Sequence, residues 1–288
     1  GFMKLRNAIK QSCDIYFYET ARILGVDRLS ILAKRYGLGL KVLNNLYIEE
    51  KSGIVPSTKW KREQLESSWL LGETIITGIG QGYIQTTPLQ LCLMTAQLAN
   101  GGYKIKPNII LSKEINYDEI RSKIKLDKEK YENASDIKKL TSLNTEFLKE
   151  QEIELYNPMY RNPENVKFVL EAMFSSTNEP GGTSFASRLE NKKYQFAGKT
   201  GTSQVRRITD EEREADLKLS EIEYKKRDHA LYVAFAPYEE PRYSISVLIE
   251  HGGSGSKAAA PLASKMIKKI IDRHDEREKI RQSRSKLI

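Results

Sequence analysis

Three segments typical of β-strands follow one another late in the chain, at residues 195–203, 231–236 and 243–250. The connection between the first two, residues 206–228, is highly charged. Consecutive strands that are joined without helices pair as an antiparallel sheet, since parallel strands need a crossover that is usually a helix. The segments before these strands favour helices. We therefore expect an α+β fold in which helices flank one antiparallel sheet.

The helices are predicted from apolar periodicity and from signals at their ends. Thr87, Pro88 and Gln90 supply an N-cap, a first-turn proline and a capping-box partner, and 100–102 (Asn-Gly-Gly) ends that helix. Asp27 is a candidate N-cap for an earlier helix that Gly37 would end. Further elements are expected as helices at 4–24, 27–36, 164–174 and 257–277, a turn at 180–183 and a long surface loop at 53–68.

Residues 112–157 differ from the rest of the chain because they are dense in Lys, Glu and Asp and poor in large apolar side chains. We interpret them as a charged surface insertion that carries no chemistry. The insertion would lie within one domain that spans residues 1–288.

The composition limits the functions to consider. A chain of 288 residues with 39% hydrophobic and 30% charged residues is typical of a globular domain. The net charge of +9 favours anionic partners, but no RNP, zinc-finger or basic-zipper pattern is present, so we expect no nucleic-acid partner. The two cysteines, Cys13 and Cys92, indicate neither a disulfide framework nor a CxxC metal motif. No apolar run reaches the ~20 residues that a membrane helix needs.

Lys199-Thr200-Gly201-Thr202 is the sharpest local motif, and it lies inside a predicted strand. A lysine on an edge strand offers a positive charge to a carboxylate, and the hydroxyls of Thr200 and Thr202 add hydrogen-bond donors beside it. Gly201 weakens a strand, so its presence indicates that something approaches the backbone closely. Taken alone, a motif this short also occurs by chance.

Ser12-Cys13-Asp14 is the second motif and precedes the aromatic run at 15–18. A serine or aspartate at this position is more often a helix N-cap than a catalytic group. The two motifs together, far apart and in this order, match the S-x-[N/D] and K-[T/S]-G motifs of penicillin-binding proteins and serine β-lactamases.

Longer stretches carry the same resemblance. Residues 8–18, 78–83, 87–90, 197–205 and 228–237 resemble the class B penicillin-binding proteins, which are D,D-transpeptidases. The Ser-Cys-Asp form of the second motif and the stretch 60–82 resemble the elongation type more than the septal type. The resemblance spans nearly the whole chain except the charged insertion. It implies the penicillin-binding protein/serine β-lactamase-like transpeptidase fold.

The resemblance also assigns roles to matching residues. Ser12 would relay protons beside the lysine of the family's first motif, and Asp14 would hydrogen-bond to that lysine and contact substrate. Lys199 would complete this network and attract the terminal carboxylate of a peptidoglycan stem peptide, which Thr200 and Thr202 would bind. The backbone N–H of Thr202 would supply half of an oxyanion hole. The predicted site therefore has Ser12, Asp14 and Lys199 as catalytic residues and Thr200, Gly201 and Thr202 as substrate-binding residues.

The family's first motif, S-x-x-K, carries the nucleophilic serine upstream of the second motif. None of the eleven residues before Ser12 forms this pattern. Matches occur only downstream, at Ser122/Lys125, Ser135/Lys138, Ser254/Lys257 and Ser283/Lys286, where the context does not fit a nucleophile. We therefore expect the chain to be the C-terminal part of a transpeptidase domain, without the nucleophile, the membrane anchor or the first strands, and inactive alone.

Cys13 has two interpretations. In some relatives the cysteine of this motif is a zinc ligand, together with upstream residues that this chain lacks, so a structural zinc would belong to a longer form. The other interpretation, a small buried thiol, is favoured because unpaired cysteine usually behaves as a small hydrophobe. The acyl transfer itself requires no cofactor.

The resemblance further implies β-lactams as ligands, membrane proteins of the elongation complex as partners, and the periplasmic face of the bacterial inner membrane as location. Two other functions remain open at this point. One is a β-lactam hydrolase of the same fold, and the other is a non-enzymatic truncated copy or scaffold piece.

Overall fold

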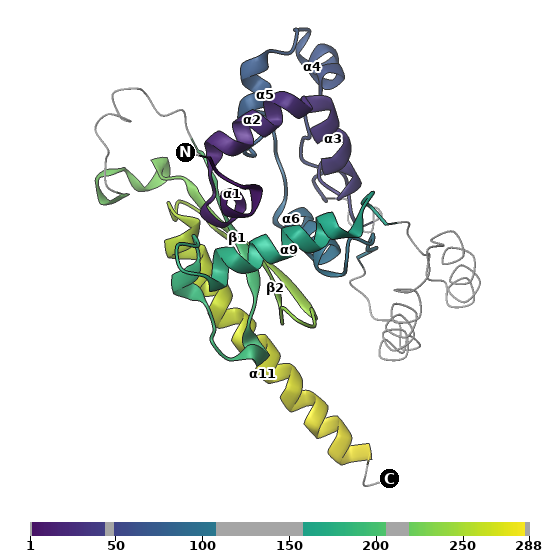
Figure 1. Cartoon of the computed structure of the whole chain (residues 1–288), viewed down its shortest axis with the longest axis vertical. Coiled ribbons are helices and arrows are strands. Elements are labelled where there is room, and N and C mark those ends of the chain that lie inside the picture. Colours follow the sequence, from purple (N-terminus) through teal and green to yellow (C-terminus); the bar gives the residue numbers. More distant parts are fainter. Residues whose placement is uncertain (1, 44–48, 108–157, 206–218, 286–288) are drawn as a thin grey trace, which may run out of the picture.

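A computed structural model describes residues 2–43, 49–107, 158–205 and 219–285 (Figure 1). The charged insertion predicted at 112–157 lies outside the described residues. In chain order the elements are α1 (Leu5–Gln11), α2 (Asp14–Leu24), α3 (Val26–Arg35), α4 (Thr58–Leu65), α5 (Leu71–Thr77), α6 (Pro88–Ala99), α9 (Pro163–Asn178), η1 (Phe185–Ser187), η2 (Lys192–Tyr194), β1 (Ala197–Ser203), η3 (Leu219–Glu221), η4 (Tyr224–Lys226), β2 (His229–Ala236), β3 (Tyr243–Ile249), η5 (Gly255–Ala259) and α11 (Ala260–Ser285).

The three described strands form one antiparallel sheet in the order β1-β2-β3. The register places Lys199 of β1 opposite Val233 of β2, which in turn lies opposite Ser246 of β3. The predicted α+β class and the antiparallel pairing are confirmed. Each strand lies within two residues of its predicted bounds, because strand ends are marked by local composition.

One face of the sheet packs against α11. Successive side chains of a strand point to opposite faces, and every second residue of β2 from Ala230 to Ala236 is fully buried on this side. Small alanines on β2 and at the start of α11 allow close approach, and Ile267 and Ile271 of α11 complete the core. Figure 1 shows α11 extending well beyond the sheet.

The opposite face of the sheet is covered by α6 and α9. Phe235 of β2 and Ala197 of β1 pack there against Met173 of α9. The Phe174 ring extends this contact to Tyr238, with ring centroids 4.3 Å apart. The sheet is therefore a central layer with helices on both sides. This arrangement leaves the edge of β1 facing α1 and the end of α9 (Figure 1).

Helices α2–α5 form a helical lobe on the far side of α1 from α11 (Figure 1). The prediction of a surface loop at 53–68 is wrong, because α4 lies within it. Ser57 caps this helix by accepting a hydrogen bond from the Trp60 N–H at 3.0 Å. Although the sequence of α4 is polar, its Lys61 is buried, and the Lys61 ammonium lies 2.5 Å from the Glu73 carboxylate of α5.

The end signals in the sequence had mixed outcomes. The capping box of α6 is confirmed, with Gln90 N–H donating to Thr87 Oγ1 at 3.2 Å. Asp27 does not cap α3, which begins one residue earlier. Its carboxylate instead accepts hydrogen bonds from the backbone and the hydroxyl of Thr58, and these bonds join α3 to α4. The single helix predicted at 4–24 is two helices, α1 and α2, which meet at Ser12.

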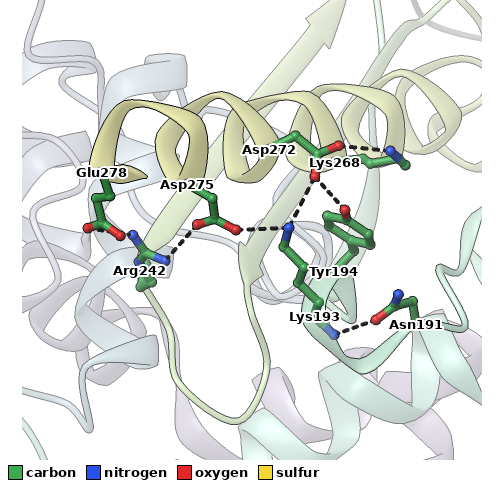
Figure 2. Close-up of polar contacts among 8 residues, drawn as sticks. All are labelled: Asn191, Lys193, Tyr194, Arg242, Lys268, Asp272, Asp275 and Glu278. Carbon is green, nitrogen blue, oxygen red and sulfur yellow. Dashed lines mark hydrogen bonds and ion pairs between the residues drawn. The ribbon is translucent and has the colours of Figure 1, made fainter. Parts of the chain in front are cut away.

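A group of ion pairs fastens α11 to the elements beside it (Figure 2). Asp272 accepts hydrogen bonds from Tyr194 and from Lys193, and Asp275 pairs with Lys193 and with Arg242. We call these five residues the α11 anchor. Hydrogen bonds from Lys268, Tyr194 and Lys193 lower the pKa of Asp272, while the Asp275 carboxylate raises the pKa of Lys193. The anchor ties α11 to η2, and only two residues separate η2 from β1.

Within the described part of the chain, no helix is both long enough and apolar enough to cross a membrane.

Candidate active site

Ser12 lies at the junction of α1 and α2, in a backbone conformation that non-glycine residues seldom adopt. Its φ and ψ are both 55°, and the N–H groups of Ser12 and Cys13 bond back to the carbonyls of Ile9 and Ala8. This left-handed residue ends α1 and lets α2 start in a new direction. Residues held in such conformations cluster at functional sites. The Ser12 side chain is exposed and points toward β1.

Lys199 of β1 meets Ser12 although 187 residues separate them in sequence. The Lys199 ammonium donates a hydrogen bond of 2.8 Å to Ser12 Oγ and another of 3.0 Å to the Thr200 carbonyl. Burial lowers the pKa of Lys199 to about 8, and the negative charge of Asp14 opposes this shift. A lysine with such a pKa carries its charge near neutral pH and still releases its proton readily.

Asp14 is the first residue of α2, and its exposed side chain acts on Lys199 through charge. The half-buried Cys13 is the N-cap residue between the two polar groups. Among the described residues, no group of three or more His, Cys, Asp or Glu side chains is placed to hold a metal ion. A zinc role for Cys13, the less favoured of its two interpretations, therefore stays a prediction about a longer form.

Thr200 belongs to a chain of hydroxyl groups that the sequence did not indicate. Thr200 Oγ1 donates to Thr183 Oγ1 at 3.1 Å, and Thr183 Oγ1 lies 3.1 Å from Ser176 Oγ at the end of α9. The turn predicted at 180–183 is confirmed, and its Pro-Gly-Gly-Thr composition is the one signal that pointed to this place. Nothing in that composition predicted contact with β1, because the contact depends on how α9 packs.

Gly201 and Thr202 lie in the second half of β1. The expected close approach to Gly201 occurs within the chain itself: a Cβ at Gly255 would lie 2.6 Å from the Gly201 carbonyl oxygen. η5 therefore packs directly on this strand. Thr202 is exposed, although its backbone belongs to the ladder that pairs β1 with β2.

A second group of hydroxyls lies beneath the motif. Tyr232 of β2 is buried, and its hydroxyl lies 3.0 Å from both Thr177 Oγ1 and Ser184 Oγ. Burial raises the pKa of Tyr232 to about 12, so the phenol stays neutral. Thr177 Oγ1 also accepts the Gly198 N–H at 3.1 Å, directly before Lys199. The backbone that leads into Lys199 is thus held by buried polar groups whose hydrogen bonds are satisfied.

Two of the downstream S-x-x-K matches begin in the described part of the chain. Ser254 Oγ lies 2.9 Å from Ser256 Oγ at the start of η5, and Ser283 Oγ donates to the Ile280 carbonyl on exposed α11. Neither serine hydrogen-bonds to Lys199 or Ser12. Ser122/Lys125 and Ser135/Lys138 lie outside the described residues. His229 Nδ1 accepts a hydrogen bond from the His251 backbone N–H at 2.9 Å, so this histidine pair joins the end of β3 to the start of β2.

These contacts bring a Ser-x-Asp motif at a helix junction against a Lys-Thr-Gly motif on an edge strand, the arrangement of the penicillin-recognising enzymes. The family model described as "Penicillin binding protein transpeptidase domain" matches residues 1–268, and the chain belongs to this family.

Within the family the chain is similar to the peptidoglycan D,D-transpeptidase MrdA. It is 30% identical to MrdA of Salmonella typhimurium over 94% of this chain and 38% of that protein, and 32% identical to MrdA of Haemophilus influenzae over 93% and 36%. The solved structure of Pseudomonas aeruginosa PBP2 in complex with WCK 5153 is 32% identical over 93% of this chain and 48% of that chain, with a TM-score of 0.66. The Helicobacter pylori complex of PBP2 with MreC is 27% identical over 94% and 40%, with a TM-score of 0.68.

These relatives confirm the predicted likeness to the elongation-type enzymes, which the solved structures name penicillin-binding protein 2, and the predicted transpeptidase fold. The chain spans well under half the length of the MrdA proteins that it matches.

Proposed function

We propose that this chain forms the part of a serine-type peptidoglycan D,D-transpeptidase of cell elongation that binds the substrate carboxylate and transfers protons. The observation that carries the proposal is the 2.8 Å hydrogen bond from Lys199 Nζ to Ser12 Oγ. It joins the second and third motifs of the family across the fold. The nucleophilic serine of an S-x-x-K motif would come from a segment outside these 288 residues.

In this proposal the nucleophile attacks the carbonyl carbon of the penultimate D-alanine of a stem peptide. An ester C–O bond forms, the amide C–N bond breaks, and the terminal D-alanine leaves as an amine. The proton released by the nucleophilic serine would pass to the lysine of its own S-x-x-K motif and then through Ser12 to the leaving nitrogen, so Lys199 would keep its positive charge throughout. The amine of a second stem peptide would then attack the ester, which completes the cross-link and frees the serine.

The same residues would hold the substrate in place. The positive charge of Lys199 and the hydroxyls of Thr200 and Thr202 would bind the terminal carboxylate, and charged hydrogen bonds of this kind are about twice as strong as neutral ones. The Thr202 N–H would stabilise the oxyanion, together with an N–H from the nucleophile's segment. A β-lactam places its own carboxylate and carbonyl in the same positions, so it would acylate the same serine.

Partners and location belong to the longer protein and follow from its relatives. The Helicobacter pylori PBP2 is solved with MreC, so we propose a membrane-associated elongation protein of that kind as a partner. The active site would face the periplasm, where the stem peptides are cross-linked.

Labelling with a fluorescent penicillin tests the proposal. The 288-residue chain should form no covalent adduct, and a longer form that includes an upstream S-x-x-K motif should form one adduct per molecule. In that longer form Lys199→Ala should slow acylation by about 10²–10³-fold, because one preorganised electrostatic contact is worth about 3–4 kcal/mol. Lys59→Ala, at an 81% exposed lysine side chain on α4, is the matched control.

Two results would contradict the proposal. One is a stoichiometric adduct on the 288-residue chain that survives denaturation, since its serine would then be the nucleophile. The other is acylation of the Lys199→Ala variant within about threefold of the parent, far less than that contact should contribute.

A further inference from the structure

The short turn at residues 179–184 touches both halves of the site, and the catalytic roles proposed above do not use it. We infer that Glu179 and Thr183 are positioning residues that hold Ser12 and Lys199 in contact. The inference rests on the proposed function only for its effect on acylation. Its structural part concerns contacts among described residues and can be tested separately.

Glu179 holds α1 at the start of the turn. Its carboxylate accepts hydrogen bonds from the guanidinium of Arg6 and, at 3.1 Å, from the ammonium of Lys10, four residues further along α1. The Lys10 side chain is only 14% exposed, so this ion pair is shielded from water more than ordinary surface pairs are. The hydrogen bond from Arg6, followed by that from Lys10, lowers the pKa of Glu179. Two contacts one helical turn apart fix the rotation of α1 about its axis, and Ser12 follows directly after this helix.

Thr183 holds the other end of the turn and contacts three elements. Its backbone N–H donates to the Lys10 carbonyl at 3.3 Å, two residues before Ser12. Its hydroxyl accepts from Thr200 Oγ1 of β1 at 3.1 Å and lies 3.1 Å from Ser176 Oγ of α9. One residue thus links the helix that carries Ser12 to the strand that carries Lys199.

The turn is rigid enough to keep this spacing because it folds back on the end of α9. Ser184 N–H donates to the Ser176 carbonyl at 3.1 Å, and Gly182 N–H donates to the Glu179 carbonyl at 3.0 Å. A Cβ at Gly182 would lie 2.3 Å from the Ser176 carbonyl oxygen, so only glycine allows this approach. Glu179 and Thr183 therefore move together with α9, which packs on the sheet.

The pKa of Lys199 provides a way to measure whether Glu179 and Thr183 hold α1 and β1 together. The pKa of this lysine is lowered by burial. Because its ammonium bonds to Ser12, and the neighbouring Thr200 bonds to Thr183, we expect this burial to depend on α1 and the turn keeping their places against β1. If either positioning contact is removed, water reaches the ammonium and the pKa of Lys199 should rise toward the ordinary lysine value of about 10.4. A change that only lowered global stability would leave this pKa unaltered in the molecules that remain folded.

The experiment is competitive acetylation of all lysines across pH in the 288-residue chain, with mass spectrometry of each labelled peptide. The parent should label Lys199 with a midpoint near pH 8. Glu179→Gln and Thr183→Val should raise that midpoint by about 1 pH unit, since each exposes the ammonium to more water. Thr183→Ser, which keeps the hydroxyl, should restore the parent value. Glu190→Gln, whose carboxylate pairs with Arg188 at 3.0 Å and is 81% exposed, is the matched control and should change nothing.

A thermal melt shows whether each variant is folded, and a milder variant provides a second test if Glu179→Gln fails to fold. Arg6→Met leaves Lys10 on the Glu179 carboxylate, so it should shift Lys199 in the same direction by less. The inference is overturned if folded Glu179→Gln and Thr183→Val proteins both titrate Lys199 as the parent does. It is also overturned if Thr183→Ser shifts the midpoint as much as Thr183→Val.

Acylation of the longer form separates this inference from the proposed function. There Thr183→Val should slow penicillin labelling about tenfold, the rate equivalent of one hydrogen bond of about 1.4 kcal/mol, and Thr183→Ser should not. If the longer parent forms no adduct at all, the proposed function fails while the Lys199 titration still decides whether the turn is a positioning device.

Discussion

Replacing Lys61 with methionine tests whether the helical lobe depends on a buried ion pair. The side chains of Lys61 and Glu73 are only 6% and 15% exposed, and their charged groups lie 2.5 Å apart. Lys61 also donates to the Ser68 carbonyl at 2.8 Å. Methionine keeps most of the aliphatic volume of lysine but removes the charge, so Glu73 would stay buried without its cation.

The size of the effect follows from what remains around the carboxylate. Removing one partner of a buried pair typically costs about 3–5 kcal/mol, because an uncompensated charge is left behind. Glu73 keeps hydrogen bonds from the Leu70 N–H at 2.7 Å and from the Tyr83 hydroxyl at 3.1 Å. We therefore expect Lys61→Met to lower the free energy of unfolding by about 3 kcal/mol, at the low end of this range.

Denaturant unfolding followed by tryptophan fluorescence suits this question. The only two tryptophans of the chain, Trp60 and Trp69, both lie against Tyr83, with ring centroids 5.4 Å and 6.2 Å from it. The signal thus reports on the lobe that contains the pair. The matched control is Lys59→Met, which removes an 81% exposed lysine paired with Glu63 at 3.7 Å and should cost at most about 0.5 kcal/mol.

Lowering the pH should reduce the loss of stability that Lys61→Met causes. Burial raises the pKa of Glu73, but hydrogen bonds from Lys61, Leu70 and Tyr83 outweigh it and leave the pKa below its ordinary value. A carboxylate with a depressed pKa stabilises the fold above its unfolded pKa of about 4.3, and this stabilisation is lost as pH falls further. The penalty of Lys61→Met should therefore shrink in acid.

A double variant tests whether the loss of stability comes from a buried carboxylate without its cation. Glu73→Gln in the Lys61→Met background removes the stranded charge, so the pair of changes should cost less than the sum of the two single changes. The reasoning fails if Lys61→Met costs no more than Lys59→Met. It also fails if the two single penalties simply add.

Three further changes test other parts of the fold. Gly182→Ala should destabilise by about 2–3 kcal/mol because its Cβ would meet the Ser176 carbonyl, whereas Gly72→Ala, at an exposed position near the start of α5 with open space around it, should stabilise by up to about 1 kcal/mol; equal thermal shifts would contradict this. Tyr232→Phe should cost about 1–3 kcal/mol by leaving its buried hydroxyl partners unsatisfied, and a neutral result in urea unfolding would show that the hydroxyl group is dispensable. Asp272→Asn should lower the melting temperature at neutral pH, and this loss should shrink steadily as pH falls below about 3.9, because a carboxylate with a depressed pKa stabilises the fold fully above its unfolded value and less as acid protonates the folded carboxylate; a loss that stays constant in acid would show that charge is not the cause.

Local patterns in the sequence were sufficient to predict an element wherever the interaction that forms it joins residues close together in the chain. The capping box of Thr87 and Gln90 joins residues three apart, and the strands at 197–203, 229–236 and 243–249 are marked by local composition. The motifs at Ser12 and Lys199 also indicated their chemistry, because that chemistry depends on residue type. The helix predicted across Ser12 failed, since a left-handed serine has no signal in composition.

Only the tertiary structure decided which distant groups meet. The segment predicted as a loop contains α4, in which Lys61 is buried against Glu73. The burial of a lysine depends on such a partner, and apolar periodicity does not reveal it. The packing of α9 places Thr183 next to Thr200 of β1. No local sequence pattern predicts that the hydroxyl of a turn residue will contact a strand. The sequence by itself determined the strands, their antiparallel pairing and the reactive residue types. Packing of α1 and α9 on the sheet determined the 2.8 Å contact between Ser12 and Lys199, because a hydrogen bond across 187 residues forms only where the whole fold brings its two atoms together.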